Sequence, residues 1–447
     1  MAALIEPKIL KGFRDFLPSA EIARRDLIGI IENTFRNFGF VPIDTPALEY
    51  SEILLGKGGG ETEKQIYRFT DNGQRDVALR FDLTVPFARY TALHQNELTF
   101  PFKRYHIAKV WRGENTQKGR YREFMQCDFD IIGADSPAAD FEILLLIHST
   151  MRALGLDVTI RVNHRGLFNA FLSHAGLRDK SMEILRTVDK IAKAGYEETR
   201  NNLAQICGDS FAATILAFTK ADKNPGPDQY SATLERITEL SGGQSEMSER
   251  LCLLGAFMQD AGIAASCILD PSITRGLDYY TGVVFETFLT AMPEIGSICS
   301  GGRYDNLCGL YTKKTISGVG SSIGLDRMIA AMESLGMVSS CTGYAACAIA
   351  NIGSVHAGTC QALAEQFRKE KISCEVFISE GELVKQCIAA EKKGIRWLII
   401  PGSNPLANPL TLRDIAARTN REGLSVAEIV NHITNEQIAK SAHNKEQ

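Results

Sequence analysis

Apolar and polar residues alternate along Val110–Asp130, which reads VWRGENTQKGRYREFMQCDFD. A period of two residues is typical of β-structure, so we predict the two strands of a hairpin here. Every second side chain of a strand points to the same face, which groups Gln126, Asp128 and Asp130. An amide and two carboxylates are therefore expected to share one wall of a pocket.

A helical period comes before this hairpin. Along Ser19–Phe40, Ser19 can cap the helix, Glu21 complements the helix dipole, and apolar residues recur at helical spacing as far as Gly39. The next stretch, FVPIDTPALEY, is proline-marked, so we predict an edge or interface strand because proline cannot donate a ladder hydrogen bond. An exposed edge strand invites pairing with a partner.

Further strands with an intervening helix complete the first part of the chain. The helix is predicted at Ala138–Leu154, and antiparallel pairing is the economical arrangement of the strands. We predict the strands at Val77–Leu83, Lys103–Arg112, Glu123–Gly133, Val283–Leu289 and Gly296–Gly301.

The pattern changes twice along the rest of the chain. From about residue 165 to 265 it becomes helix-rich, which indicates a helical insertion. After Met337, strands at Tyr344–Ala350, Ser373–Ile378 and Arg396–Pro401 alternate with helices, so parallel neighbours are expected. We therefore predict an α+β fold with two domains, 1–337 (interrupted by the insertion) and 343–447, the second a small α/β domain with a further strand in PLTLRDIAAR and a closing helix at 425–435.

Composition limits the class of protein. With 447 residues, 45% of them hydrophobic and 23% charged, the chain is typical of a globular protein with more than one core. No apolar run reaches the eighteen or so residues of a membrane span, and the N-terminus lacks the layout of a signal peptide, so we expect no membrane association and a cytoplasmic location. The 11 cysteines form no C-x-x-C pair and the 8 histidines no metal-binding pair, so we expect reduced thiols and no metal site.

Positive charge is concentrated around the hairpin. The stretch 103–123 has a local excess of +5 in a chain of net charge −4. Guanidinium groups suit phosphate oxygens because each planar fork donates two parallel hydrogen bonds, so a nucleotide or nucleic acid is the expected ligand. The alternative is a solvated hairpin face. The basic residues are Lys103, Arg104, Lys109, Arg112, Lys118, Arg120 and Arg122, against Glu114 and Glu123.

Short motifs carry the remaining chemistry. In RFDLT we place Asp82 and Thr84 on the same face of a strand, where a carboxylate and a hydroxyl could hold an ammonium group. Glycines also make turns and tyrosines also pack in cores, but several such motifs in fixed order favour a binding site. The others are TRGLDYYTG (Thr274–Gly282), CSGGRYDNL (Cys299–Leu307) and GVGSSIGLDRM (Gly318–Met328).

Together with the hairpin, these motifs resemble the class II aminoacyl-tRNA synthetases, specifically the histidyl-tRNA synthetase family, over nearly the whole chain. KGFRDFLP and GFVPIDTP resemble the family's opening and its first class motif, WRGENTQKGRYREF the second, and GLDR the third. RGLDYY and GGRYD resemble the two signatures peculiar to the histidine enzymes.

The resemblance implies an antiparallel sheet that binds ATP, flanked by helices, with the helical insertion and a C-terminal anticodon-binding α/β domain. It implies that Arg112 grips the α-phosphate, Glu114 lies near adenine, Phe124 stacks on adenine, and Arg327 lies on the opposite side of the nucleotide. Arg275 matches an arginine that touches the α-phosphate from the side opposite Arg112.

The same resemblance assigns the amino-acid and RNA contacts. Asp82, Thr84 and Gln126 match positions that hold the backbone of histidine. Asp130, Tyr280 and Tyr304 match positions that contact or line the imidazole pocket. The basic loop with Gln117, Lys118 and Arg120 lies where the family meets the acceptor end of its RNA.

The implied activity is that of a histidine–tRNA ligase. Histidine's carboxylate attacks the α-phosphorus of ATP to give histidyl-adenylate and pyrophosphate, and the adenylate then acylates the 3′ end of tRNA(His). Mg²⁺ accompanies the nucleotide, no prosthetic group is expected, and the first class motif implies a homodimer. The alternative is the histidine-sensing, non-catalytic regulatory subunit of ATP phosphoribosyltransferase, a relative that shares the fold but generally lacks the C-terminal domain.

Overall fold

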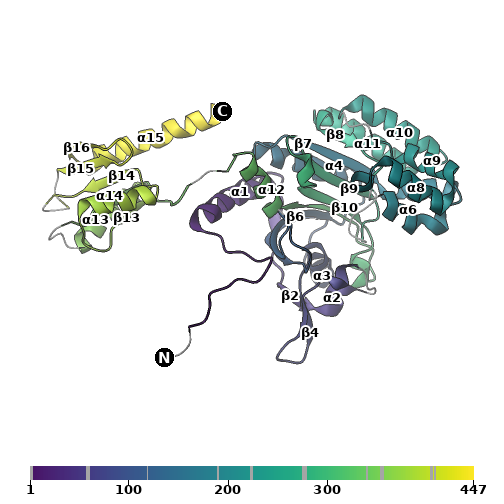
Figure 1. Cartoon of the computed structure of the whole chain (residues 1–447), viewed down its shortest axis with the longest axis horizontal. Coiled ribbons are helices and arrows are strands. Elements are labelled where there is room, and N and C mark those ends of the chain that lie inside the picture. Colours follow the sequence, from purple (N-terminus) through teal and green to yellow (C-terminus); the bar gives the residue numbers. More distant parts are fainter. Residues whose placement is uncertain are drawn as a thin grey trace. The chain divides into compact units, whose positions relative to one another are not determined.

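The computed structural model describes residues 4–56, 61–117, 119–188, 191–221, 225–273, 279–338, 341–352, 357–402, 406 and 409–446. They form two compact units, one of Met1–Arg14 with Leu27–Val338 and one of Asp15–Asp26 with Ser339–Gln447. Residues of helix α1 (Pro18–Asn37) are divided between the two units. Figure 1 labels the helices and strands.

The first unit is built on an eight-stranded sheet in the order β1-β5-β6-β11-β10-β9-β7-β8. Its neighbours are antiparallel except for β1–β5 and β7–β8, which are parallel pairs at the two edges, so the antiparallel prediction is confirmed for the body of the sheet only. The strands are β1 (Val41–Pro42), β5 (Phe102–Trp111), β6 (Glu123–Ile132), β7 (Val158–His164), β8 (Cys267–Leu269), β9 (Val283–Leu289), β10 (Cys299–Tyr304) and β11 (Gly318–Gly324).

The hairpin predicted from the alternating pattern is β5–β6. It is in register from Phe102 opposite Ile132 to Trp111 opposite Glu123. The edge strand predicted from the prolines is confirmed as β1, which pairs with β5.

A smaller, three-stranded sheet in the order β2-β4-β3 corrects the prediction for RFDLT. The strand expected at Val77–Leu83 ends at Leu79, and Thr84 already begins helix α3, so Asp82 and Thr84 do not lie on a strand. The physical reason is a helix start: the Asp82 carboxylate accepts the backbone N–H of Val85 at 3.1 Å, which favours the turn over further pairing. The elements here are β2 (Leu48–Tyr50), α2 (Ser51–Leu55), β3 (Arg68–Thr70), β4 (Asp76–Leu79) and α3 (Thr84–His94).

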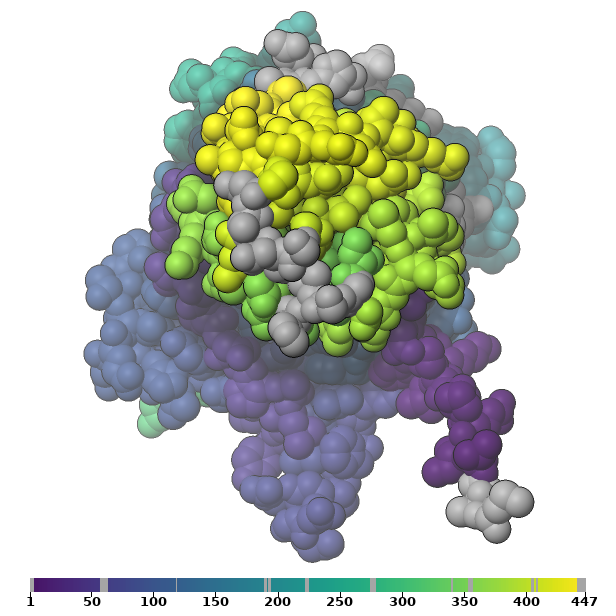
Figure 2. All heavy atoms as spheres, turned by 90° about the vertical axis from the view of Figure 1, so that its left-hand side faces the viewer, coloured from purple at the N-terminus to yellow at the C-terminus, as the bar shows by residue number. Residues whose placement is uncertain are grey.

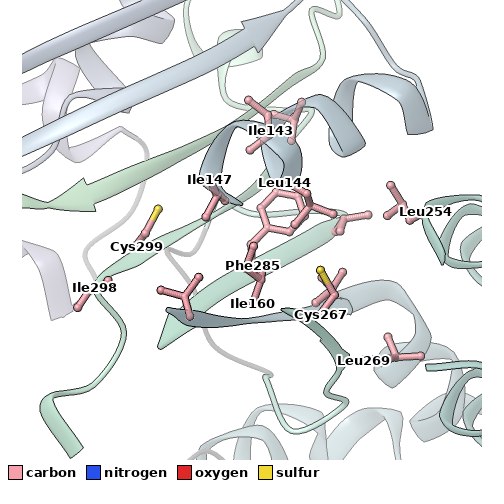
Figure 3. Packing of buried hydrophobic residues seen from close by; sticks show 14 of the residues in the cluster. Ile143, Leu144, Ile147, Ile160, Leu254, Cys267, Leu269, Phe285, Ile298 and Cys299 are labelled. Carbon is pink, nitrogen blue, oxygen red and sulfur yellow. The ribbon is translucent and has the colours of Figure 1, made fainter. Parts of the chain in front are cut away.

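Two helices, α4 (Pro137–Ala153) and α12 (Leu325–Ser334), help to build the core of the first unit; α4 agrees with its prediction within one residue at each end. Figure 3 shows Ile143, Leu144 and Ile147 of α4 together with Ile160 of β7 and Phe285 of β9. All five are essentially inaccessible to solvent. This packing holds the sheet in place.

The stretch predicted to be helical is helical. Figure 1 shows α6 and α8 to α11 gathered as one group. The helices are α5 (Arg165–His174), α6 (Ser181–Val188), α7 (Ile191–Ala194), α8 (Tyr196–Cys207), α9 (Asp209–Thr219), α10 (Pro227–Leu240) and α11 (Glu246–Asp260).

The second unit contains a five-stranded sheet in the order β13-β12-β14-β15-β16. The first three strands are parallel as predicted, whereas β15 and β16 are antiparallel additions and β16 was not predicted; its exposed polar residues give no apolar alternation. In Figure 2 the yellow residues, which include α15, pack against the green elements of this unit. Its elements are β12 (Cys347–Ile349), α13 (Ala357–Lys369), β13 (Cys374–Val376), α14 (Leu383–Lys392), β14 (Trp397–Ile400), β15 (Leu410–Asp414), β16 (Thr419–Leu424) and α15 (Val426–Glu446).

Among the helices that the structure describes, none combines the length and the apolar character that a membrane crossing requires.

Strands β10 and β11 approach each other so closely that position 301 has no room for a side chain. A Cβ atom added there would lie 2.1 Å from the carbonyl oxygen of Gly320, a backbone atom that cannot move aside cheaply. We expect Gly301→Ala to lower the free energy of unfolding of this unit by about 1–3 kcal/mol. Urea unfolding followed by Trp111 fluorescence in a Trp397→Phe background measures it. Gly309→Ala, where nothing lies within 4 Å of the added atom, is the control, and equal stability of the two variants would contradict the argument.

Candidate functional site

A cavity of about 250 Å³ opens in the first unit. Strands β6, β10 and β11, the start of α3 and the loop after β5 supply its walls. Of the predicted site residues, Arg275 and Lys118 lie outside the described residues, and Gln117 is described but does not line the cavity. The others all line it: Asp82, Thr84, Arg112, Glu114, Arg120, Phe124, Gln126, Asp130, Tyr280, Tyr304 and Arg327.

Three buried carboxylates form one end of the cavity. Asp82, Asp128 and Asp130 are each no more than 2% exposed. Arg104 pairs with one of them: its Nη2 atom is 2.6 Å from Oδ2 of Asp130. Burial raises the pKa of Asp128 to about 7 and also raises the pKa values of Asp82 and Asp130. The charge of Arg104 opposes the shifts at Asp128 and Asp130. The hydrogen bond from Val85 and the charge of Arg112 oppose the shift at Asp82. We call these three aspartates the acidic end.

Tyrosines hold two of these carboxylates in place. The Tyr304 hydroxyl donates to Oδ1 of Asp130 at 2.6 Å, and the Tyr279 hydroxyl donates to Oδ2 of Asp82 at 3.1 Å. Burial raises the pKa of the Tyr280 and Tyr304 phenols, so both stay neutral at physiological pH. The acidic end therefore combines carboxylates with neutral hydroxyl groups.

Glycines on β11 leave room for this arrangement. A Cβ atom at Gly320 would lie 2.0 Å from Oδ1 of Asp130, and one at Gly318 would lie 2.4 Å from the Tyr304 ring. The sequence GVGSSIG thus serves close packing of the strand against the acidic end.

An amide and hydroxyls continue the wall beyond the carboxylates. Gln126 donates from Nε2 to Oγ of Ser322 at 2.8 Å. Within the part of the chain that the structure describes, the buried Oε1 of Gln126 accepts no hydrogen bond. The hydroxyl oxygen of Thr84 lies 3.5 Å from Oδ2 of Asp128. These acceptors suit a ligand that brings N–H groups.

Guanidinium groups and an aromatic ring form the opposite end. The Arg112 side chain donates from Nε to the carbonyl of Phe81 at 2.9 Å, and its guanidinium carbon lies 5.1 Å from the centre of the Phe124 ring. Arg327 donates from Nη1 to the carbonyl of Ser297 at 2.6 Å. Burial lowers the pKa of Arg327 from its usual 12.5, which leaves it charged. We call Arg112, Phe124 and Arg327 the cationic end.

The loop after β5 closes over the cationic end. Gln117 and Arg120 form an isolated bridge around Gly119, whose φ of +72° favours glycine. Arg120 reaches Glu114 at 3.7 Å. A Cβ atom at Gly119 would lie 3.4 Å from the Arg327 backbone, so the loop packs against that residue.

The basic run around the hairpin has more than one purpose, which corrects the prediction that it serves phosphate as a whole. Arg104 is fully buried and pairs with Asp130, Lys103 pairs with Glu142, and Lys109 pairs with Glu123. Arg122 donates from Nε to the carbonyl of Glu114 at 3.2 Å. Among the described members of the run, only Arg112 and Arg120 line the cavity.

The N-terminal segment adds contacts that the motifs did not reveal. Gly12 accepts the N–H of Arg122 at 2.9 Å through its carbonyl. Arg14 lies 3.8 Å from the centre of the Tyr121 ring and pairs with Asp326, which accepts the N–H of Met125 at 2.7 Å. Five further residues are absent from the sequence-based list of site residues, although the alternating pattern had already placed Asp128 on the pocket wall. They are Arg14, Arg104, Asp128, Tyr279 and Asp326.

No group of three or more side chains suited to a metal ion occurs among the described residues.

Two family models match the chain in succession. The first, for histidyl-tRNA synthetase, covers residues 12–328, and the second, for an anticodon binding domain, covers residues 346–436.

Similar proteins agree with these matches. A histidine–tRNA ligase from Treponema denticola is 52% identical over 89% of both chains. A crystal structure of histidyl-tRNA synthetase from Nostoc sp. superposes with a TM-score of 0.86 at 30% identity, covering 97% of this chain and all of that one. A Bacillus halodurans structure described as an ATP phosphoribosyltransferase regulatory subunit/histidyl-tRNA synthetase has a TM-score of 0.72 at 20% identity, over 87% of this chain and 97% of that one, which shows a shared fold alone.

The expected α+β architecture is confirmed, with its antiparallel-rich sheet, flanking helices and separate C-terminal sheet. A family model that spans most of the chain and a relative that is half identical leave one assignment: the chain belongs to the histidyl-tRNA synthetase family.

Proposed function

We propose that this chain is a histidine–tRNA ligase that activates L-histidine with ATP and transfers it to tRNA(His). The observation that carries the proposal is one cavity with two chemically opposite ends. The acidic end suits a cationic amino acid, and the cationic end suits a nucleotide.

Histidine would lie at the acidic end. Three buried carboxylates lie together here and one of them is paired with Arg104, so an ammonium group would find carboxylate partners at this end. We assign Asp82, Thr84 and Gln126 to the backbone of the amino acid, and Asp130, Tyr280 and Tyr304 to the imidazole pocket. Side chains that bond both ring nitrogens discriminate strongly, because a wrong side chain leaves buried polar groups unpaired.

ATP would lie at the cationic end. Phe124 offers an aromatic face for adenine, and Arg327 a planar cation for its other side. Arg112 would donate to the α-phosphate, where negative charge develops during in-line attack, and Glu114 would lie near adenine. Arg275 would act from the opposite side, an assignment that rests on the family resemblance alone.

Mg²⁺ would arrive with the nucleotide. Its ordinary ligands in such sites are the β- and γ-phosphate oxygens, with one or two carboxylates and several waters. The chain's own residues would then supply binding and orientation, and we expect no prosthetic group.

The RNA would contact both units. We propose that residues 1–337 are the catalytic domain, interrupted by the helical insertion at about 165–265, and that residues 343–447 bind the anticodon. The turn at Gln117–Arg120, with Lys118, is the proposed contact for the acceptor end of tRNA(His). We also propose a cytoplasmic location.

The competing function is that of a histidine-sensing regulatory subunit. Such a protein would bind histidine without activating it. A C-terminal segment that matches the anticodon-binding model favours the ligase.

Exchange of radiolabelled pyrophosphate into ATP, dependent on L-histidine, tests the activity. We expect the wild type to catalyse exchange. In Arg112→Ala the exchange rate should fall about 100- to 1,000-fold, because a hydrogen-bond donor to the charge that develops on the α-phosphate is removed. We expect a similar fall in the exchange rate of Arg275→Ala. Arg152→Ala, an exposed position on α4, is the control. Absence of exchange by folded wild type would exclude the ligase.

The acidic end predicts a pH dependence of stability. Folding raises the pKa of Asp128 from 3.8 to about 7, so between these values the folded state holds a proton that the unfolded state has released. Wild type should therefore lose up to about 1.4 kcal/mol of stability per pH unit through this group as pH rises from 4 to 7, and nothing further above 7.

Asp128→Asn has no carboxyl group to ionise, so it should not lose stability in this way. Its free energy of unfolding, measured relative to that of the wild type at the same pH, should therefore rise from pH 5 to pH 7 and then level off. Urea unfolding at pH 5, 6, 7 and 8 measures the difference. The exposed Asp260→Asn variant should show a flat difference. A flat difference for Asp128→Asn as well would mean that Asp128 has an ordinary pKa.

We also propose a homodimer, which would cover two exposed strand edges. Val41 on β1, at the edge of the eight-stranded sheet, and Leu48 and Tyr50 on β2, at the edge of the three-stranded sheet, are 40–49% exposed, although apolar strand edges are normally covered. We expect sedimentation velocity to give about twice the 49.1 kDa of one chain, and Val41→Glu to shift the protein toward monomer. A wild type that sediments as a monomer at all concentrations would rule the dimer out.

A further inference from the structure

A buried ion cluster lies behind the acidic end of the cavity. Arg303 precedes Tyr304 on β10, so the two side chains leave opposite faces of the sheet. The Arg303 guanidinium donates to Oδ1 of Asp140, on α4, at 2.9 Å from Nε and 2.6 Å from Nη2. On the other side of the same carboxylate, Arg250 of α11 donates from Nε to Oδ2 at 2.5 Å.

Because this ion cluster is buried, each charge in it needs the others as partners. The side chains of Asp140 and Arg303 are no more than 2% exposed, and that of Arg250 is 17% exposed. Removing one member of such a cluster leaves a buried charge short of partners, so the remaining members shift or admit water. The position of Arg303 therefore depends on Arg250, a residue of the predicted helical insertion, which contains α5 to α11 and is called the helical segment below.

Arg303 in turn holds the segment that carries Tyr280. Its carbonyl accepts the N–H of Thr281 at 2.8 Å. The Thr281 hydroxyl donates to Oδ2 of Asp305 at 2.6 Å, and Nη1 of Arg303 lies 3.4 Å from Oδ1 of that carboxylate. Both tyrosines assigned to the imidazole pocket thus adjoin residues bonded to Arg303.

A second residue of the helical segment bonds to the backbone around Tyr280. Arg165, the first residue of α5, donates from Nη1 to the carbonyl of Tyr280 at 2.9 Å, and its backbone N–H donates to the carbonyl of Gly282 at 3.1 Å.

Apolar packing makes the link between the helices and the sheet rigid. Figure 3 shows Leu254 of α11 beside the same core that contains Leu144 of α4 and Phe285 of β9. A shift of α11 would therefore reach β10 through both ionic and apolar contacts.

From these contacts we propose that Arg250, assisted by Arg165, is a positioning residue through which the helical segment sets the shape of the imidazole pocket. The inference deepens the proposed function and rests on histidine being the ligand of the acidic end. It assigns the helical segment a role in selecting the amino acid.

The test compares three full-length variants. Arg250→Met keeps the length of the side chain without its charge, and Arg250→Lys keeps the charge without the fork. Arg161→Met is the matched control, because Arg161 pairs with the buried Asp270 at 3.0 Å and neither residue lines the cavity. The readouts are the KM values for histidine and for ATP in pyrophosphate exchange, and the Kd for histidine by calorimetry.

We expect Arg250→Met to raise both the KM and the Kd for histidine roughly tenfold, the scale of coupling within one ion cluster. The KM for ATP should change less than about twofold, because the residues of the cationic end lie in the β5–β6 hairpin and on α12, outside the cluster. Arg250→Lys should recover part of the loss, and Arg161→Met should behave as wild type.

Two results would overturn the proposal: an unchanged Kd for histidine in folded Arg250→Met, or equal rises in the KM for both substrates. Failure of the proposed function looks different. A wild type that binds histidine but does not catalyse exchange would contradict the ligase, and the calorimetric comparison would still decide the role of Arg250.

Discussion

The site depends on a single buried charge pair, Arg104 with Asp130. Three carboxylates gather within one cavity, and burial raises the pKa of each. A fully buried guanidinium beside Asp130 opposes that effect, and Tyr304 fixes the other oxygen of the same carboxylate. These two contacts fix the carboxylate of Asp130, the residue that we propose for the imidazole of histidine.

The β5–β6 hairpin sets the distance between the two ends of the cavity. Phe124 and Asp130 are six residues apart on β6, which is roughly 20 Å at the usual rise of a strand. That span suits a ligand made of an amino acid joined to a nucleotide. A single rigid element therefore holds Phe124 and Asp130, the residues that we propose for adenine and for imidazole, which favours catalysis by positioning.

Local patterns in the sequence predicted the hairpin, the helix α4, the helical segment and the parallel part of the second sheet. They failed at one local turn and where the outcome depended on distant partners. Asp82 looked like a strand residue because its neighbours are apolar, but it lies two residues before helix α3 and accepts the N–H of Val85 in that helix. Arg104 looked like a phosphate ligand, and only the fold reveals that Asp130 lies opposite it across the hairpin. Arg14 and Asp326 are 312 residues apart, and no periodicity links them.

The most direct test of this account is a crystal structure with L-histidine and a non-hydrolysable ATP analogue bound together. The account predicts the imidazole between Asp130 and the two tyrosines, the ammonium group near Asp82 and Gln126, and Arg112 on the α-phosphate. Histidine bound elsewhere, or an Arg112 side chain directed away from that phosphate, would contradict it.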